Sequence, residues 1–523
     1  MRWCALSGQG GNMLAKALSM GLIGIEAYLI EVEADVSSGL PAVTLVGMAD
    51  AAVKESRERV KSAIKNSGYE WPAQRITVNL APSDIKKEGA SFDLAIALAI
   101  LAATEQIDAQ RLNMFAVLGE LSLDGLIRPV TGALAASLFL SQAEIPVKDI
   151  ILPLENAAEA AWANNVNIWP AHNLKEAVEI IHQTQSYSPY QIERRDLSNK
   201  ICSYGIDFSD VKGQYLAKRA LEVAVAGGHN ILMIGPPGSG KTMLAERLPT
   251  IMPELTEGEI IEINRIHSVA GTIPKKDGIL FRRPFRAPHH NCSSVALVGG
   301  GAYPRPGEIS LSHRGVLFLD ELPEFRRDCL EALRQPLEEG CIRISRARRS
   351  ITYPASFMLV CAMNPCPCGF YTDRKRLCRC GTTKIQNYKA KISGPLVDRI
   401  DIHVEVPVVK YQELSSNLAA ESSEQIKIRI DKARLMQKER LSSGEILFNA
   451  QMSHKQVRKF CCLAKVEAEL LKTAMNKLNF SARAYDKILK VSRTIADLAE
   501  CEEIKAEHLA EAVQYRSLDR SFI

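Results

Sequence analysis

At 523 residues the chain is too long for one ordinary domain, and 46% hydrophobic and 24% charged residues are typical of a globular protein. The apolar run LAIALAILAA, from Leu94, is far too short to span a membrane, and the first residues lack the apolar core of a secretory signal. The net charge of +5 indicates little by itself. Thirteen cysteines, scattered apart from four at 366–380, favour a reducing cytoplasm over a disulfide scaffold.

The first third of the sequence alternates between strand-like and helix-like patterns. In YLIEVEADV, residues 28–36, apolar side chains alternate with acidic ones, which predicts a half-buried strand. Apolar residues recur at helical spacing between Val53 and Ile64. The Asp-Gly pair at 124–125, between two short apolar runs, predicts a hairpin turn. Residues 1–183 are therefore expected to form an α+β domain.

Two segments of this domain, EGASFDLAIA and GELSLDGLIRPVTGAL, resemble the peptidase domain of Lon-type proteases. In that resemblance Ser91 takes the place of the nucleophile, but Leu134 stands where the catalytic lysine would be. A serine needs a neighbouring base to become a nucleophile, and leucine cannot serve as one. We therefore expect a Lon-protease-like fold without the catalytic dyad, kept for structure or assembly.

Two polar stretches divide the rest of the chain. The first, TQSYSPYQIERRDLSNK, has no apolar periodicity and predicts a linker at 184–200. The pattern from 201 to 408 predicts a nucleotide-binding α/β core. After a second break, Ser422 and Gln425 form a capping-box pair at the start of a helical segment, which we expect to be a lid domain at 409–523.

The segment NILMIGPPGSGKTMLAERL combines an apolar strand, a glycine-rich turn and a helix-forming stretch. It matches the P-loop pattern G-x-x-x-x-G-K-[ST] in the required strand–loop–helix order. Backbone N–H groups and the helix N-terminus would hold phosphate oxygens, Lys241 would reach the terminal phosphates of ATP, and Thr242 would bind Mg²⁺. The predicted nucleotide-binding residues are Gly235, Pro236, Pro237, Gly238, Ser239, Gly240, Lys241 and Thr242.

Three further segments supply candidates for ATP hydrolysis. GVLFLDELPEF predicts a buried strand ending in Asp320, which would hold Mg²⁺, and Glu321, which would polarise the attacking water. FMLVCAMN predicts a strand ending in Asn364, whose amide could orient that water; a simple Asn-Pro turn cap is the alternative. In SGPLVDRID, Arg399 could act as an arginine finger on a neighbouring subunit's nucleotide, unless it pairs with an adjacent aspartate.

A family resemblance is carried by the P-loop together with FRAPHHNCSSVALVGGGAYPRPGEISLSHRGVLFLDELPEF, LRQPLEEGCIRISR, NPCPCG, SGPLVDRID and AEHLAEAVQYRSLDR. As a set, and over essentially the whole chain, these segments resemble the ComM/YifB family of magnesium-chelatase-like AAA+ ATPases. The resemblance implies an ATP-driven ring, usually a hexamer. For the ComM members it implies a DNA motor that promotes branch migration in homologous recombination during natural transformation. It assigns the Walker A role to Lys241 and the Walker B role to Asp320 with Glu321. It further assigns sensor 1 to Asn364, the arginine finger to Arg399 and sensor 2 to Arg483.

Two basic segments are candidates for contact with DNA. In IRISRARRS, alternating isoleucines predict a strand, and in related ring helicases a hairpin at this place lines the pore, where arginines would grip phosphates without reading bases. FRRPFRAPHH interleaves arginine with phenylalanine, a mixture suited to backbone tracking and base stacking. The alternative for both is a solvated basic face or pairing at a subunit interface. The candidate residues are Arg343, Arg346, Arg348, Arg349, Arg282, Arg283 and Arg286.

The segment CAMNPCPCGFYTDRKRLCRC contains two Cys-x-Cys pairs separated by basic residues. Four thiolates can hold Zn²⁺ in a tetrahedral site, although the spacing is tighter than the usual C-x₂-C. The ligands would be Cys366, Cys368, Cys378 and Cys380. The alternative is an exposed loop with reduced thiols.

The motifs together predict an ATPase that moves or remodels DNA, with ATP and Mg²⁺ as cofactors and no membrane partner. Two other functions use the same ATPase core: a protein remodeller that threads polypeptide, and a motor subunit of a metal chelatase. Stimulation of ATP hydrolysis by DNA, by unfolded protein or by a porphyrin-binding partner distinguishes the three.

Overall fold

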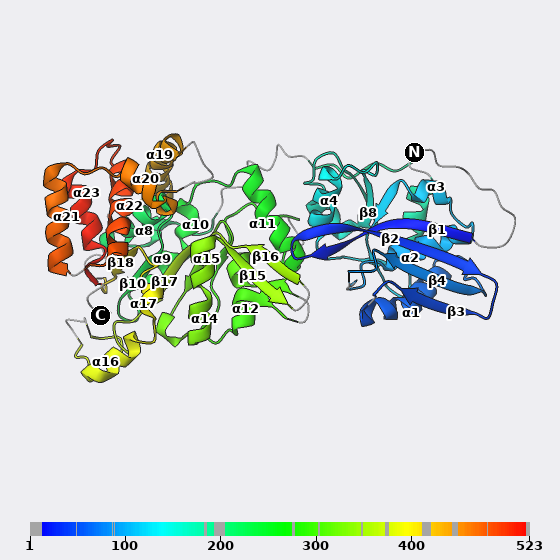
Figure 1. Cartoon of the computed structure of the whole chain (residues 1–523), viewed down its shortest axis with the longest axis horizontal. Helices are drawn as coiled ribbons and strands as arrows, with labels where there is room; N and C mark the ends of the chain where they lie inside the picture. The colour runs from blue at the N-terminus through cyan, green and yellow to red at the C-terminus, as the bar shows by residue number, and fades with distance from the viewer. Residues whose placement is uncertain are drawn as a thin grey trace. The chain divides into compact units, whose positions relative to one another are not determined.

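The computed structural model describes residues 13–48, 50–85, 87, 89–182, 186–192, 204–274, 278–301, 304–346, 349–371, 376–409, 420–441, 448–478 and 480–518. The chain divides into two compact units (Figure 1). The N-terminal unit consists of Met1–Asn199 and Ile260–Leu280, and the P-loop unit of Lys200–Glu259 and Phe281–Ile523. Most of the predicted linker at 184–200 lies outside the described residues.

The N-terminal unit is built on a mixed seven-stranded sheet of order β3-β4-β2-β1-β5-β8-β9. Strand β2 pairs antiparallel with both β1 and β4, while the other pairings are parallel. The strands of the sheet are β1 Met13–Ile23, β2 Glu26–Ser37, β3 Ala42–Val46, β4 Arg75–Ala81, β5 Phe115–Val117, β8 Asp149–Pro153 and β9 Asn167–Ala171. A separate hairpin joins β6 Glu120–Leu121 to β7 Ile127–Arg128.

Three local predictions for this unit are confirmed. The apolar side chains that alternate along β2 from Ile30 to Val36 are buried. Helix α1 buries both Val53 and Ile64. The β6–β7 hairpin turns at Gly125, whose φ of 88° is a left-handed conformation that glycine adopts without steric strain.

Helices cover this sheet, and one of them is buried along its whole length. The helices are α1 Ala51–Asn66, α2 Asp93–Ala103, α3 Ala109–Leu112, α4 Ala133–Gln142, α5 Leu154–Ala160 and α6 Leu174–His182. Every residue of α2 is buried, including Asp93, to which Arg59 donates hydrogen bonds of 2.8 and 3.3 Å. Leu134, which the sequence resemblance matched to the catalytic lysine of Lon-type proteases, is buried in α4.

The P-loop unit contains a five-stranded sheet of order β11-β14-β17-β10-β18, in which all recorded pairings are parallel. Its strands are β11 Phe285–Arg286, β14 Val316–Leu319, β17 Met358–Met363, β10 Ile231–Ile234 and β18 Ile402–Glu405. The side chains of β10, β14 and β17 are all buried, as expected for central strands of a parallel sheet covered on both faces. The predicted buried strands before Asp320 and Asn364 are therefore confirmed.

Short helices and two small ribbons surround this sheet. The helical elements are η3 Phe208–Asp210, α8 Tyr215–Gly227, α9 Lys241–Glu246, α10 Leu248–Ile251, α12 Ser294–Val298, α13 Glu308–Leu311, η4 Leu322–Glu324, α14 Arg327–Ala332, α15 Arg334–Glu339, α16 Thr382–Lys389 and α17 Gly394–Val397. The ribbons pair β12 Gly299–Gly300 with β13 Arg305–Pro306, and β15 Cys341–Arg346 with β16 Arg349–Pro354. The strand predicted from Ile342 and Ile344 is thus confirmed as one arm of a hairpin.

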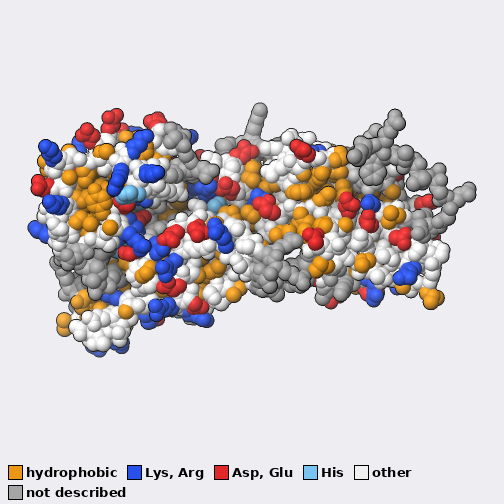
Figure 2. Space-filling model, in the orientation of Figure 1, with side chains coloured by type: hydrophobic (Ala, Val, Ile, Leu, Met, Phe, Trp, Pro, Cys, Tyr) orange, Lys and Arg blue, Asp and Glu red, His pale blue; other side chains and the backbone are white. Residues whose placement is uncertain are grey.

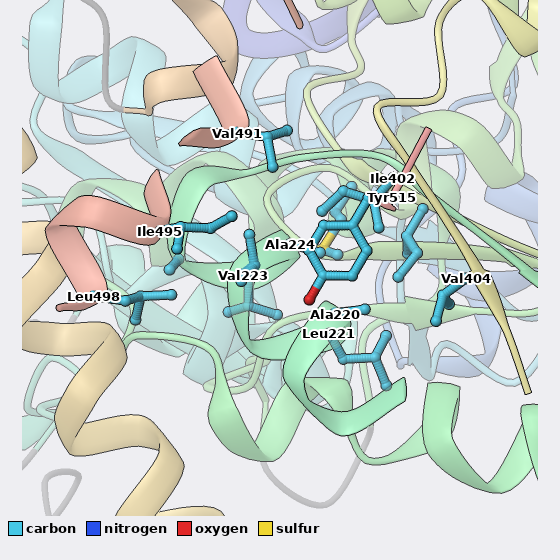
Figure 3. Close-up of a cluster of buried hydrophobic side chains, with 14 of the residues drawn as sticks. Ala220, Leu221, Val223, Ala224, Ile402, Val404, Val491, Ile495, Leu498 and Tyr515 are labelled. Carbon is cyan, nitrogen blue, oxygen red and sulfur yellow. The ribbon is translucent and has the colours of Figure 1, made fainter. Parts of the chain in front are cut away.

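The C-terminal part of the P-loop unit is helical, with α19 Ser423–Leu441, η5 Asn449–Gln451, α20 His454–Phe460, α21 Lys465–Leu478, α22 Ala482–Leu498 and α23 Ala506–Gln514. The predicted capping box at the start of α19 is confirmed by hydrogen bonds in both directions between Ser422 and Gln425, at 3.1 and 3.3 Å. Figure 3 shows Val491 and Ile495 of α22 in the same buried cluster as Val223 of α8 and side chains of β18. None of the described helices has both the length and the apolar composition needed to cross a membrane.

Helix α11, Glu257–Ala270, begins in the P-loop unit and continues into the N-terminal unit. Within the N-terminal unit, Val269 is buried in a cluster with residues of α4 and β8. Arg265 Nε donates to the Ile25 carbonyl at 2.9 Å, and the Gly132 N–H donates to the Ser268 carbonyl at 3.0 Å. Residues 260–280, which the sequence pattern groups with the ATPase core, therefore pack with the N-terminal unit.

Candidate ATP site and its neighbouring motifs

The sheet of the P-loop unit brings the predicted ATP-site residues to one edge. Strand β17 lies between β10 and β14, with Ile234 opposite Met363 and Leu319 opposite Cys361. Because the strands are parallel, their carboxyl ends lie at the same edge of the sheet, and open α/β sheets bind their ligands at that edge. Asp320, Asn364 and the P-loop each follow one of these strands directly.

The P-loop backbone needs glycine at two positions for different reasons. Gly240 caps the start of α9 with a φ of 88°, in the left-handed region that disfavours side chains. At Gly235 a side-chain Cβ would lie 2.1 Å from the Val406 carbonyl oxygen, so no larger residue fits without displacing the backbone. Gln214 Nε2 contacts the loop by donating a hydrogen bond to the Ser239 carbonyl at 2.9 Å. The loop is therefore shaped by packing against its surroundings as well as by its own sequence.

Lys241 is the buried cation of this site, with 8% of its surface exposed. Its Nζ donates to the carbonyls of Gly235 and Pro236 at 2.8 and 3.0 Å and to Asn364 Oδ1 at 3.4 Å. Burial lowers the pKa of Lys241, although the charges of Asp320 and Glu321 oppose the shift. A phosphate oxygen is a stronger partner for this ammonium than a carbonyl, because such a hydrogen bond joins opposite charges.

Thr242 and Asp320 present two oxygens suited to Mg²⁺. Thr242 Oγ1 donates to Asp320 Oδ2 at 2.8 Å. Two neighbouring ligands of an octahedral Mg²⁺ with bonds of 2.0–2.1 Å lie about 2.9 Å apart. The spacing and the oxygen chemistry of this pair therefore fit the ion, which would neutralise charge on a bound phosphate.

Glu321 has an unusual backbone and a partner that the sequence did not indicate. Its φ is 52°, a left-handed conformation that is uncommon outside glycine. His290 Nδ1 lies 3.3 Å from Glu321 Oε2, and the rings of His289 and His290 lie 4.1 Å apart. The APHHN segment follows β11, whose end lies beside that of β14, and this neighbourhood is the signal that could have identified His290.

Arg399 and Arg483 are held by partners outside the P-loop. Arg399 Nη1 donates to the Pro395 carbonyl at 2.6 Å, and Nη2 donates to Glu338. Arg483 Nη1 lies 3.6 Å from Asp398 Oδ2 and its side chain is exposed. None of these recorded contacts brings either arginine to the phosphate-binding loop of its own chain.

Comparison with known proteins identifies the family. Residues 207–414 match the family described as "Magnesium chelatase, subunit ChlI", residues 32–156 match "Subunit ChlI of Mg-chelatase", and residues 420–516 match "Magnesium chelatase, subunit ChlI C-terminal". The chain is 44% identical over 513 residues to the competence protein ComM of Haemophilus influenzae, covering 97% of this chain and 98% of that protein. The chain belongs to the ComM/YifB family of magnesium-chelatase-like AAA+ ATPases.

Other relatives agree with this assignment, which confirms the resemblance seen in the motifs. The protein YifB of Escherichia coli is 43% identical over 507 residues, 96% of each chain. A magnesium-chelatase 67 kDa subunit of Chlorobaculum parvum is 27% identical over only 164 residues, 31% of this chain and 23% of that protein. Membership of the ComM/YifB family implies ATPase activity with ATP and Mg²⁺, in agreement with the site described above.

In this ComM/YifB protein the first basic segment forms the β15–β16 hairpin. Arg343 is exposed on β15, with a 3.4 Å ion pair to Glu339. Arg346 and Arg349 are opposite each other in the strand register at the end of the ribbon where β15 leads into β16, although their side chains are not among those described. Arg348 lies outside the described residues. The hairpin is thus present where a pore-lining ribbon was predicted, immediately before β17.

The second basic segment is mostly committed to contacts within the P-loop unit. Arg283 is 9% exposed and donates to the carbonyls of Pro253, Arg314 and Glu254 and to Glu259. Arg286 makes two hydrogen bonds of 2.6 and 2.7 Å to Glu308. Arg282 is exposed and lies over the ring of Tyr204. Arg283 and Arg286 therefore hold this segment in place and present no free cation to a nucleic acid in this structure.

The four clustered cysteines lie close together in space. Cys366 Sγ is 3.3 Å from Cys368 Sγ and 3.7 Å from Cys378 Sγ, and all four sulfurs, including that of Cys380, lie within 4.8 Å of one another. Backbone N–H groups directed at its sulfur lower the pKa of Cys368 to about 6. The donor set and its compactness fit a soft divalent metal ion such as Zn²⁺.

Proposed function

We propose that this protein is an ATP-driven motor that moves branched DNA, acting on recombination intermediates during natural transformation. The observation that carries the proposal is the position of the basic hairpin. Strand β16 ends at Pro354 and β17 begins at Met358, and β17 ends next to Asn364 beside Lys241. A change at the terminal phosphate can thus reach the hairpin along a single strand. The name of the relative ComM, a competence protein, supports the biological setting.

In this proposal each residue of the ATP site has one task. Lys241 binds the terminal phosphates, and Thr242 with Asp320 holds Mg²⁺, which neutralises charge on the phosphates. Glu321 polarises the attacking water once its contact with His290 is released, and Asn364 orients that water. The arginines Arg399 and Arg483 act as arginine finger and sensor 2.

The proposal includes an assembly. Because the recorded partners of Arg399 are Pro395 and Glu338, it would serve the nucleotide of a neighbouring subunit in a ring, which we expect to be hexameric. The helices from α19 to α23 would form the lid, the N-terminal unit would have a Lon-like fold, and the protein would work in the cytoplasm. Figure 2 shows Lys and Arg side chains spread over the P-loop unit with acidic ones among them, so affinity for DNA would depend on local basic elements such as the hairpin.

The test is DNA binding and movement by hairpin variants. Replacing Arg343, Arg346 and Arg349 together by alanine should leave basal ATP hydrolysis intact and reduce its stimulation by DNA. The slope of log affinity against log salt should fall by up to about 3, because each lost phosphate contact removes roughly one released counterion. ATP-dependent movement of a four-way DNA junction, followed by gel electrophoresis, should be lost.

A matched control removes three exposed arginines elsewhere. Arg57, Arg111 and Arg326 are each about half exposed or more and pair locally with acidic residues. Their triple alanine variant changes the net charge equally and should keep both DNA stimulation and salt dependence. If the two triple variants behave alike, the hairpin is not the DNA-binding element.

Two alternatives remain as outcomes of the same assays. Stimulation of ATP hydrolysis by unfolded polypeptide and not by DNA would indicate a protein remodeller. Stimulation that requires a porphyrin-binding partner would indicate a chelatase motor subunit. Among the relatives the chelatase alternative has less support, because the 67 kDa chelatase subunit is similar over 31% of this chain and the competence protein ComM over 97%.

A further inference from the structure

The four-cysteine cluster has the dimensions of a tetrahedral metal site. With Zn–S bonds of about 2.3 Å, the sulfurs of a Zn²⁺ tetrahedron lie about 3.8 Å apart. The recorded separations are 3.3, 3.6 and 3.7 Å among Cys366, Cys368 and Cys378, and Cys380 completes the group within 4.8 Å. A disulfide would need about 2.05 Å, and all four thiols are free. The ligands come as two pairs from the two ends of one loop.

The first pair of cysteines lies against the phosphate-binding loop. Gly369, directly after Cys368, has a φ of 82°, and its N–H donates to the Cys366 carbonyl at 2.9 Å, so these residues form a tight turn. A Cβ on Gly369 would lie 2.4 Å from Pro237 Cδ. The turn that carries the two sulfurs therefore packs directly on the P-loop, and glycine is required there for both conformation and space.

The same pair is also close in sequence to Asn364, the amide proposed to orient the water. Cys366 is fully buried and stands two residues after Asn364, which accepts from Lys241. The second pair, Cys378 and Cys380, leads into α16. A metal ion bound by both pairs would fix the ends of this loop relative to each other and thereby hold the turn against Pro237.

We propose that Cys366, Cys368, Cys378 and Cys380 bind one Zn²⁺, and that this ion holds the turn at Gly369 on the P-loop and Asn364 in its place beside Lys241. Thiols that bind the ion release their protons to solvent, and no redox step is involved. Loss of the metal frees the turn and weakens nucleotide binding. This inference rests on the P-loop as the ATP site, but not on DNA as the substrate.

The first test measures the metal on the full-length protein. Elemental analysis by mass spectrometry should find about one zinc per chain in the wild type and none after Cys378→Ser with Cys380→Ser. The matched control, Cys462→Ser with Cys501→Ser, changes two free cysteines outside the cluster and should keep its zinc. Protein loaded with Co²⁺ should show the absorption bands of a tetrahedral thiolate complex. Absence of both zinc and a tetrahedral Co²⁺ spectrum in the wild type overturns the metal site.

The second test separates the metal from its effect on the nucleotide. Chelation of the zinc in the wild type should weaken binding of a fluorescent ATP analogue, and added Zn²⁺ should restore it. Gly369→Ala should keep the zinc but weaken analogue binding by roughly tenfold, because the left-handed conformation and the contact with Pro237 are both strained. Unchanged nucleotide affinity in both cases overturns the coupling even if zinc is bound. Since DNA is absent from these assays, failure of the DNA-motor proposal would not affect the result.

Discussion

Replacement of Glu159 by glutamine should stabilise the N-terminal unit above neutral pH. Glu159 lies in α5 with 5% of its surface exposed, and its Oε1 accepts from Asn156 Nδ2 at 2.5 Å. Burial raises the pKa of Glu159 from 4.5 to about 7, and the side chains of Ser268 and Asn156 oppose this shift only in part. The folded environment therefore favours the neutral acid, whereas a solvent-exposed glutamate is a carboxylate at neutral pH.

The magnitude follows from the two pKa values. In the unfolded chain Glu159 titrates near 4.5, so its contribution to stability is fully present below that pH and is lost as pH rises through about 7. Each unit of pKa corresponds to about 1.4 kcal/mol, so about 3 kcal/mol is lost by pH 8 and less than about 1 kcal/mol by pH 5. Glutamine stays neutral at every pH and keeps an oxygen for Asn156.

The assay is urea unfolding of the full-length protein at pH 5 and pH 8. The advantage of Glu159→Gln over the wild type in free energy of unfolding should be about 2–2.5 kcal/mol larger at pH 8 than at pH 5. Glu58→Gln is the control, because Glu58 is exposed and paired with Arg57 at the surface. An advantage of Glu159→Gln that does not grow with pH would refute the assignment of a buried neutral carboxyl.

Further variants test the ATPase machinery and the buried ion pair between Asp401 and Lys487. Lys241→Ala should reduce ATP hydrolysis at least about 100-fold with an unchanged circular dichroism spectrum, and an active variant would exclude this loop as the ATP site. Arg399→Ala should bind a fluorescent ATP analogue normally but not hydrolyse ATP, and mixing it with the Lys241→Ala protein should restore hydrolysis; failure to do so contradicts action between subunits. Asp401→Asn leaves Lys487 buried without its counter-charge and should lower the free energy of unfolding by about 3–5 kcal/mol, whereas adding Lys487→Met should recover much of it; equal losses in the single and double variants would show that the ion pair is unimportant.

Much of the ATP site could be predicted because its signals are local in sequence. A buried apolar strand followed by a glycine-rich turn and lysine specifies its own geometry, so the β10–α9 segment was recognisable by itself. The strands before Asp320 and Asn364 are short continuous apolar runs, the pattern of parallel strands covered on both faces. The chain order also placed both residues at the carboxyl ends, where the sheet then brings them together.

Side-chain partners distant in sequence could not be predicted in the same way. Arg283 and Arg282 are adjacent and look equivalent in FRRPF, yet one is buried among backbone carbonyls and the other is exposed. The backbone path of this irregular segment determines which of the two arginines is buried. The sequence has no periodic pattern there from which that path could be predicted. Likewise nothing in the pattern of α11 shows that its residues from Ile260 onward pack with a unit some hundred residues earlier in the chain.

The connection between Arg399 and the C-terminal helices shows what such distant contacts contribute. Asp401 forms a 2.8 Å ion pair with Lys487 of α22 and lies 3.3 Å from His229, whose other ring nitrogen contacts Thr494 of the same helix at 2.9 Å. Burial acts to raise the pKa of Asp401, but Lys487 and His229 outweigh it and lower that pKa. The carboxylate is thus charged, buried and held from two sides, so α22 cannot tilt without pulling on it. Because Asp401 follows Arg399 by two residues, we expect a movement of α22 to shift Arg399 as well, so that this helix and the proposed arginine finger would be mechanically coupled.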